Sequence, residues 1–226
     1  GLFESEGFDR TELDLPEQIN RLIAAVAKAN PKTAVALSNG SPVLMPWLDD
    51  VGAVLEMYLA GQAGGGALAQ LVFGELCPSG KLAETFPLAL DHVPAQADFG
   101  EHPRRVVYRE GLNVGYRYFT SYDDQPVLFP FGFGLSYTSF DYGEVRLSAV
   151  KSDLTEPITV TVPVSNSGAV AGAAVVAVTR GSSLFAQIPS TSLRRGTKRR
   201  TYATTTTCTL RKTHLRCKWF NCVRGK

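Results

Sequence analysis

Residues 51–86 read VGAVLEMYLAGQAGGGALAQLVFGELCPSGKLAETF. The apolar run in Val51–Leu59 predicts a strand over part of its length, and the glycines of Gly61–Gly66 predict a flexible turn. Ala67–Phe73 then predicts a helix, and Lys81–Phe86 predicts a further strand. Because strands alternate with a helix here, this stretch favours an α/β layer architecture with a largely parallel sheet.

The upstream sequence continues the same pattern. Residues 16–30 predict a helix that begins at Pro16, a residue suited to the first helical position. An apolar face recurs at i, i+3, i+4 and i+7 and is expected to be buried; its members are Ile19, Leu22, Ile23 and Val26. Asn30-Pro31 ends the helix, and Thr33–Leu37 predicts a buried strand.

The downstream sequence changes character twice. Between Val107 and Tyr142 aromatic residues are dense and interleaved with Gly and Pro, which indicates a packed, irregular segment. Ile158–Val164 alternates by strand rules, and Val170–Val178 predicts the next strand after a turn. These strands are typical of the beginning of an all-β module, such as an immunoglobulin-like sandwich.

The tail, residues 179–226, differs in charge from everything before it. It holds 12 of the 23 Lys and Arg residues and none of the 21 Asp and Glu residues. Alternating apolar periodicity is also lost, so we predict a disordered or frameshifted extension. Binding of nucleic acid by its basic clusters is the weaker interpretation, because charge runs are usually solvated.

No cofactor or metal site is expected. The spacing of Gly61–Gly66 matches neither common phosphate-binding motif, and the three histidines lack H-E-x-x-H spacing. A zinc site in the tail would need an unusual spacing; its candidate ligands are Cys208, His214, Cys217 and Cys222. No apolar run is long enough to predict a membrane span, and the first ten residues lack the features of a signal peptide.

A series of ordered motifs resembles the C-terminal part of glycoside hydrolase family 3, which includes β-glucosidases and β-xylosidases. They are ESEGFDR (4–10), LDLPEQINRLI (13–23), NPKTAVALSNGSPVLMPW (30–47), AGQAGGGALAQLVFGELCPSGKLAETFP (60–87), YREGLNVGYRYF (108–119) and PVLFPFGFGLSYTSFDY (126–142). The resemblance implies an α/β sandwich domain over residues 1–142, lacking some N-terminal strands. It further implies that residues 143–178 begin a fibronectin type III-like domain, and that an N-terminal (β/α)8-like barrel is missing from this chain.

The resemblance also implies a mechanism. Family members retain anomeric configuration with two carboxyl groups, a nucleophile and an acid/base residue. The nucleophilic Asp belongs to the barrel, so this chain is predicted to be inactive alone. Glu6 matches the acid/base position of the motif, and Glu4 is the fallback because a two-residue alignment slip would exchange them.

Other residues near the motif receive supporting roles. Asp9 and Arg10 are expected to order the loop, as an ion pair or through backbone bonds. Phe3 and Trp47 are weaker candidates for stacking on a sugar, with core packing favoured for both. The implied substrate is a β-linked oligosaccharide or an aryl or alkyl glycoside, and glucose, xylose and N-acetylglucosamine all stay open. The alternative function is a non-catalytic carbohydrate-binding or interdomain docking module.

Overall fold

The computed structural model describes residues 3–100, 104–121, 126–149 and 158–176, together with strand backbone at 202–210 and 215–217. The chain forms two compact units. Unit 1 comprises Gly1–Val72 and Leu82–Phe133, and unit 2 comprises Phe73–Lys81 and Gly134–Lys226. In the second half of the chain the two units divide at Phe133/Gly134, and the domain boundary expected at residue 142 stays a prediction.

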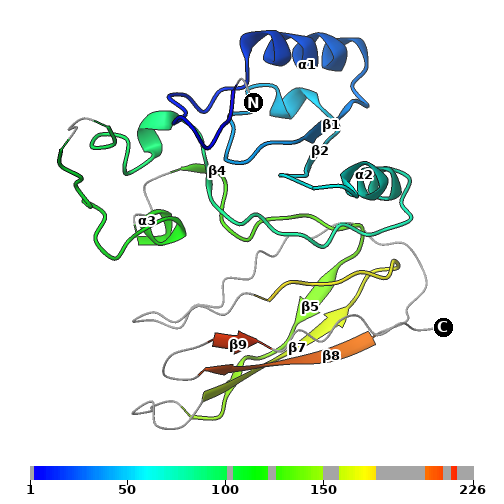
Figure 1. Cartoon of the computed structure of the whole chain (residues 1–226). Coiled ribbons are helices and arrows are strands. Elements are labelled where there is room, and N and C mark those ends of the chain that lie inside the picture. The colour runs from blue at the N-terminus through cyan, green and yellow to red at the C-terminus, as the bar shows by residue number, and fades with distance from the viewer. Residues whose placement is uncertain are drawn as a thin grey trace. The chain divides into compact units, whose positions relative to one another are not determined.

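Unit 1 is built around a pair of parallel strands, as the sequence predicts. Strand β1 (Ala34–Leu37) pairs in register with β2 (Ala53–Glu56), from Ala34 opposite Ala53 to Leu37 opposite Glu56. Helix α1 (Glu17–Ala29) precedes β1 and lies along one side of this pair (Figure 1). Pro16 is the N-cap, and the helix begins at Glu17, one residue later than the sequence predicts.

The apolar face of α1 is only partly covered. Ile23 packs against the core and Ala27 is buried. The other predicted members of the buried face remain substantially exposed: Ile19, Leu22 and Val26 at 42, 59 and 44%. The prediction of a fully buried face is therefore wrong for these three, because a pair of strands is too narrow to cover the whole stripe of a helix.

The remaining elements of unit 1 are short. Helix α2 (Gly64–Val72) begins inside the glycine-rich turn, and β3 is confined to Phe86–Pro87, at the end of the expected strand. Strand β3 pairs antiparallel with β4 (Val127–Phe129). Helix α3 (Tyr116–Ser121) and two 3₁₀ turns (Leu48–Asp50 and Leu90–His92) complete the unit. The buried core contains Leu37, Val43, Met45, Trp47 and Phe86.

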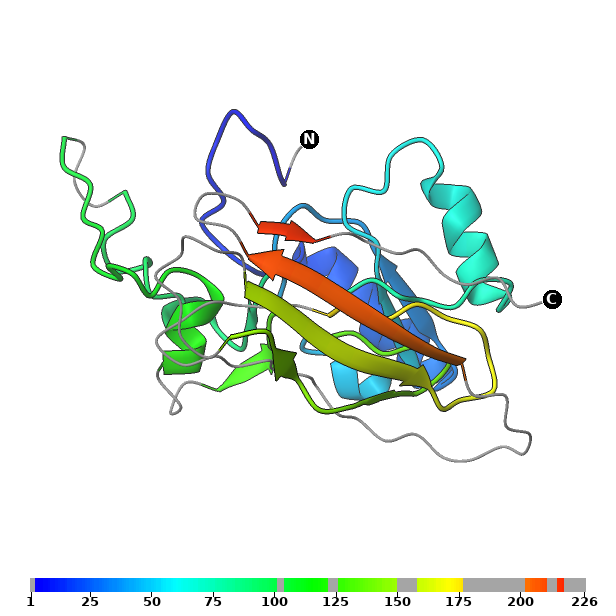
Figure 2. The same cartoon turned by 90° about the horizontal axis from the view of Figure 1, so that it is seen from below.

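Unit 2 contains an antiparallel sheet. Strand β7 (Ile158–Asn166) lies between β5 (Phe140–Tyr142) and β8 (Tyr202–Leu210). The two nine-residue strands β7 and β8 run side by side in Figure 2. Strand β6 (Arg146–Leu147) also pairs with β7, and β9 (Leu215–Cys217) pairs with β8. Alternate residues of β7 are buried, namely Val160, Val162 and Val164, which agrees with the strand predicted there.

Two expectations for the C-terminal part need correction. Residues 170–176 form no strand, although the sequence predicts one over Val170–Val178. Strands β8 and β9 lie within the tail for which disorder is predicted. Their register places Cys208 opposite Cys217, whereas the other candidate zinc ligands, His214 and Cys222, lie outside the described residues. The frameshift hypothesis stays a prediction.

Candidate functional site

The carboxyl ends of β1 and β2 carry a group of polar residues. In α/β sheets this edge is where ligand sites form, since the connecting loops leave the sheet there. The loop after β1 begins with Ser38 and buried Asn39, and β2 ends on half-buried Glu56. The Asn39 side-chain amide donates to the Ser41 carbonyl at 2.9 Å and to Glu56 Oε2 at 3.2 Å. The loop after β1 is thereby tied to the end of β2.

The N-terminal segment is attached to this loop by Glu4. The Gly40 amide donates to Glu4 Oε2 at 2.8 Å, and the Ser41 hydroxyl donates to Glu4 Oε1 at 3.1 Å. Arg10 Nη1 forms an ion pair with Glu4 Oε1 at 3.0 Å. Both oxygens of Glu4 are therefore occupied, and the segment lies beside the β1–β2 pair (Figure 1).

Arg10 contributes further contacts at the same place. Its Nη1 donates to the Ser41 hydroxyl at 2.6 Å and to the Pro42 carbonyl at 3.3 Å. The acidic partner of Arg10 is Glu4, while Asp9 is exposed. Glu4 and Arg10 thus close the base of a loop that runs from residue 4 to residue 10.

Glu6 lies at the tip of that loop. Ser5 and Phe8 form an isolated antiparallel bridge, so Glu6 and Gly7 occupy the turn of a miniature hairpin. The Gly7 amide donates to the Ser5 hydroxyl at 3.0 Å, which tightens the turn. Glu6 itself is exposed. The structure therefore presents the Glu6 carboxyl outward on a short turn with a clamped base.

Electrostatics distinguish Glu4 from a proton donor. Partial burial acts to raise the pKa of Glu4, but the Gly40 amide, the Ser41 hydroxyl and the Arg10 charge together hold that pKa below its ordinary value of 4.5. A general acid needs a raised pKa instead, because it must remain protonated near neutral pH. Glu4 in this arrangement is a charged anchor.

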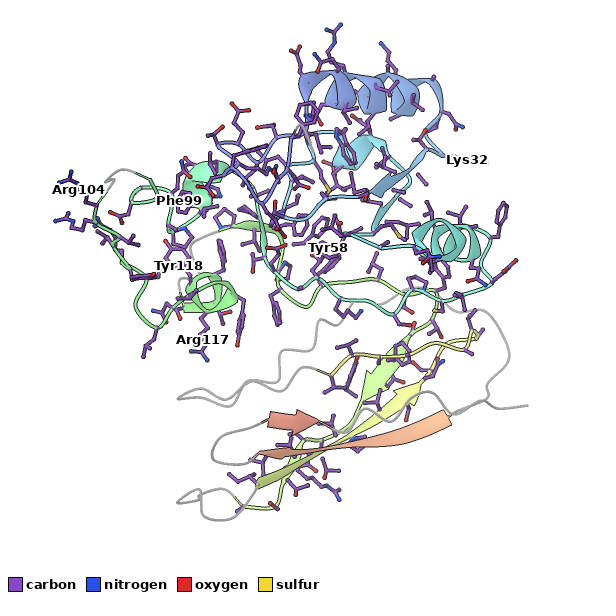
Figure 3. All side chains as sticks on the ribbon, in the orientation of Figure 1. Lys32, Tyr58, Phe99, Arg104, Arg117 and Tyr118 are labelled. Atoms are coloured by element: carbon purple, nitrogen blue, oxygen red, sulfur yellow. The ribbon has the colours of Figure 1, made fainter. Side chains whose placement is uncertain are left out.

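Two further carboxyl groups, those of Glu56 and Glu84, interact with each other, and Glu56 also interacts with Glu4. Burial raises the pKa of Glu56, the neighbouring charge of Glu4 raises it further, and the bonds from Tyr58 and Asn39 oppose this. Burial and the charge of Glu56 likewise raise the pKa of Glu84. Burial also raises the pKa of Tyr58, and Figure 3 shows this residue among the packed side chains of unit 1.

The backbone at Tyr58 is held in an unusual conformation. Its φ of 46° lies in the left-handed region, which a residue with a side chain adopts at a cost. The Tyr58 amide donates to Glu56 Oε1 at 2.9 Å, and its carbonyl accepts from the Ser38 hydroxyl at 3.2 Å. These bonds fix the chain where it leaves β2. Such strain is common where loops build functional sites.

The two aromatic candidates differ in placement. Phe3, which directly precedes Glu4 in the sequence, is 63% exposed, so the expectation that it packs in the core is wrong for this residue. Trp47 is only 2% exposed and donates its indole N–H to Asn20 Oδ1 at 2.9 Å. This burial corrects the expectation that Trp47 could stack on a sugar and assigns it to core packing, which was the favoured interpretation.

Sequence reasoning missed the residues that hold the loop, above all Asn39, Gly40, Ser41 and Glu56. The signal that marks this loop is the run Asn39-Gly40-Ser41-Pro42 directly after the predicted strand Thr33–Leu37, because these residue types favour turns. Among the described residues no group of three or more His, Cys, Asp or Glu side chains could hold a metal ion. In the same part of the chain no helix is long and apolar enough to span a membrane.

Comparison with known proteins addresses the resemblance directly. The model of the glycosyl hydrolase family 3 C-terminal domain matches residues 1–137, which include the hairpin, its clamp and both parallel strands. The chain belongs to glycosyl hydrolase family 3. Its mixture of helices and small sheets in unit 1 agrees with an α/β fold.

Curated family members similar to the chain are β-glucosidases by name. The thermostable beta-glucosidase B of Acetivibrio thermocellus is 53% identical over 176 residues, which cover 77% of this chain and 23% of that protein. The probable beta-glucosidase I of Aspergillus fumigatus is 42% identical over 178 residues, which cover 77% of this chain and 21% of that protein. The chain thus spans about a fifth of the length of these relatives.

Solved structures support the same assignment. A beta-glucosidase from Kluyveromyces marxianus in complex with glucose superposes with a TM-score of 0.74 at 35% identity, covering 92% of this chain and 25% of that one. DesR, a beta-glucosidase from Streptomyces venezuelae in complex with D-glucose, superposes with a TM-score of 0.65 at 45% identity. The match covers 74% of this chain and 21% of that one.

Proposed function

We propose that this chain supplies the acid/base-bearing domain of a retaining, β-glucosidase-like hydrolase that cleaves terminal β-glycosidic bonds. The nucleophilic carboxylate belongs to a (β/α)8-like barrel outside this chain. The substrate is a β-linked oligosaccharide or an aryl or alkyl β-glycoside. The observation that carries the proposal is the exposed Glu6 on a hairpin whose base is clamped by Glu4 and Arg10.

Glu6 protonates the glycosidic oxygen as the bond to the leaving group breaks. It then removes a proton from the water that hydrolyses the glycosyl-enzyme. For this role a carboxyl must gain a raised pKa, and an exposed position leaves it free to be desolvated against a partner surface and a bound sugar. Glu4 is the weaker choice, because its oxygens are occupied and its pKa is lowered.

Residues 143–178 are proposed as the beginning of a fibronectin type III-like domain. The antiparallel pairing of β6 with β7 and the alternating burial of Val160, Val162 and Val164 on β7 support this assignment. A β-sandwich buries one face of each sheet in this way.

A hybrid enzyme tests the proposed function. The matching 176-residue segment of the Acetivibrio thermocellus β-glucosidase is replaced by the corresponding residues of this chain. We expect the hybrid to hydrolyse phenyl β-glucoside and the isolated chain to show no turnover. Glu6→Gln in the hybrid should lower kcat/KM by about 10²- to 10⁴-fold, the contribution of general acid catalysis. Glu12→Gln, at an exposed acid nearby, is the matched control.

Azide provides a second readout of the same role. In Glu6→Gly, azide can attack the anomeric carbon of the glycosyl-enzyme in place of water and release the nucleophilic carboxylate, because this anion needs no general base. Azide should therefore restore turnover of an activated dinitrophenyl glucoside and yield the β-glucosyl azide. A Glu6→Gln hybrid with full activity on phenyl β-glucoside would disprove the assignment.

A non-catalytic carbohydrate-binding or interdomain docking module is the second candidate. It is favoured by the exposed apolar residues of one segment of unit 1, namely Phe99, Val106, Tyr108, Leu112 and Val114, which are 57 to 86% exposed. Exposed apolar groups of this size often mark interaction surfaces. Tight binding of a cello-oligosaccharide by the chain alone, together with an inactive hybrid, would support this candidate.

A further inference from the structure

The Glu6 hairpin is connected to unit 1 by a defined set of contacts at its base. Glu4 lies two residues before Glu6, and Arg10 lies four residues after it. Glu4 contacts Gly40 and Ser41, and Arg10 contacts Ser41 and the carbonyl of Pro42. The ion pair between Glu4 and Arg10 joins the two sides of the hairpin at the same point.

The loop that receives these contacts is itself held from the sheet. Asn39 is 5% exposed and connects the Ser41 carbonyl to Glu56 at the end of β2. Glu56 in turn accepts the amide of Tyr58. A continuous chain of hydrogen bonds therefore runs from the end of β2, through Asn39 and Ser41, to Glu4 at the base of the hairpin.

From this geometry we propose that Glu4 is a positioning residue that acts through Glu6. The proposal rests on the proposed function, in which Glu6 is the acid/base residue. A general acid must lie within hydrogen-bond reach of the oxygen that it protonates. A two-residue turn has little rigidity of its own, so the direction of Glu6 depends on where the hairpin base is attached. Glu4 does not itself transfer a proton.

A double-mutant cycle in the hybrid enzyme tests the proposal. Glu4→Gln, Glu6→Gln and the double variant are compared on phenyl β-glucoside, whose leaving group needs protonation, and on 2,4-dinitrophenyl β-glucoside, whose leaving group does not. The parameter is kcat/KM, which reports cleavage of the glycosidic bond without the later hydrolysis step. Glu12→Gln is the matched control, and circular dichroism verifies that each variant folds.

We expect Glu4→Gln to lower kcat/KM by about 10- to 100-fold on the phenyl glucoside, the cost of a misplaced catalytic group. On the dinitrophenyl glucoside the change should be below about threefold. In the Glu6→Gln background, Glu4→Gln should add no further loss, because residues that act as one unit are non-additive.

Other results would overturn the proposal in distinguishable ways. Equal losses on both substrates, or full additivity with Glu6→Gln, would show that Glu4 does not act through Glu6, while the proposed function would survive. An unaffected Glu6→Gln hybrid would remove the proposed function and the positioning role together. If Glu4→Gln does not fold, Ser41→Ala replaces it: this variant removes one hydroxyl from the same clamp and should show the same substrate dependence, or else the proposal fails.

Discussion

Replacing Glu4 by glutamine should destabilise unit 1 in a pH-dependent way. The carboxylate accepts bonds from Arg10, Ser41 and Gly40 at 3.0, 3.1 and 2.8 Å. Glutamine retains one acceptor oxygen and no charge, so the contacts of the other oxygen and the ion pair are lost. Bonds to charged groups contribute about 1.5–3 kcal/mol and exposed ion pairs about 0–1. Because the Glu4 side chain is 32% exposed, we expect a loss of about 1–2 kcal/mol near neutral pH.

The sign of the pH dependence follows from the lowered pKa of Glu4. A carboxyl whose pKa is lower in the folded state stabilises the fold fully above its unfolded value and loses that contribution as pH falls through the folded pKa. The difference between the native chain and Glu4→Gln should therefore be largest near neutral pH and should vanish well below 4.5.

Hydrogen exchange during urea unfolding is the appropriate measurement, because the chain has two compact units and a global probe would mix them. Peptides covering β1 and β2 report unit 1 specifically. Glu12→Gln, at an exposed acid, is the control and should change the free energy of unfolding by less than about 0.5 kcal/mol. A Glu4→Gln effect that is constant with pH, or that grows in acid, would refute the role of Glu4 as a charged anchor.

Three further predictions concern the sheet edge and the two cores. Glu56→Gln should show the opposite pH dependence to Glu4→Gln: since burial raises the pKa of Glu56, the stability of the variant relative to native should improve as pH rises above 4.5, and the same unfolding series measures this. Phe86→Ala should cost unit 1 about 3–5 kcal/mol in urea unfolding, because Phe86 is fully buried in its core. Gly168→Ala should destabilise unit 2, since an added Cβ would lie 2.2 Å from Thr138 Oγ1 and 2.7 Å from the amide nitrogen of Ser139. An added Cβ at Gly66 in α2 meets nothing within 4 Å, so Gly66→Ala should stabilise unit 1 by about 0.5–1 kcal/mol. Hydrogen exchange in peptides of each unit measures the two effects separately.

Local pattern predicted the main elements of unit 1 well. Helix α1 and strands β1 and β2 lie where apolar periodicity and Asn30-Pro31 place them. Burial was predicted less well. The apolar stripe of a helix indicates which side chains are suited to a core, but it does not indicate how much of that stripe the sheet covers. Ile19, Leu22 and Val26 illustrate this difference.

Unit 2 was harder to predict for a related reason. Strand β7 alternates clearly and was found from its sequence. Its partner β8 (Tyr202–Leu210) contains a run of threonines without alternation of apolar and polar residues in its sequence, and it pairs with β7 across a long sequence separation. Strand pairing depends on backbone hydrogen bonds whose groups are the same for every residue, except that proline lacks the N–H donor, so sequence pattern alone did not identify it.

The sequence by itself determined the family, through ordered motifs over residues 4–142, and it identified Glu6 and Glu4 as the two candidate carboxyls. Only the tertiary structure distinguishes the surroundings of these two carboxyls. Glu4 meets Gly40 and Ser41, which are more than thirty positions away along the chain, and these contacts keep it charged. Glu6 extends from the tip of the hairpin that Glu4 and Arg10 close. The role of a carboxyl depends on its surroundings, and those are assembled by folding rather than by neighbouring residues in the sequence.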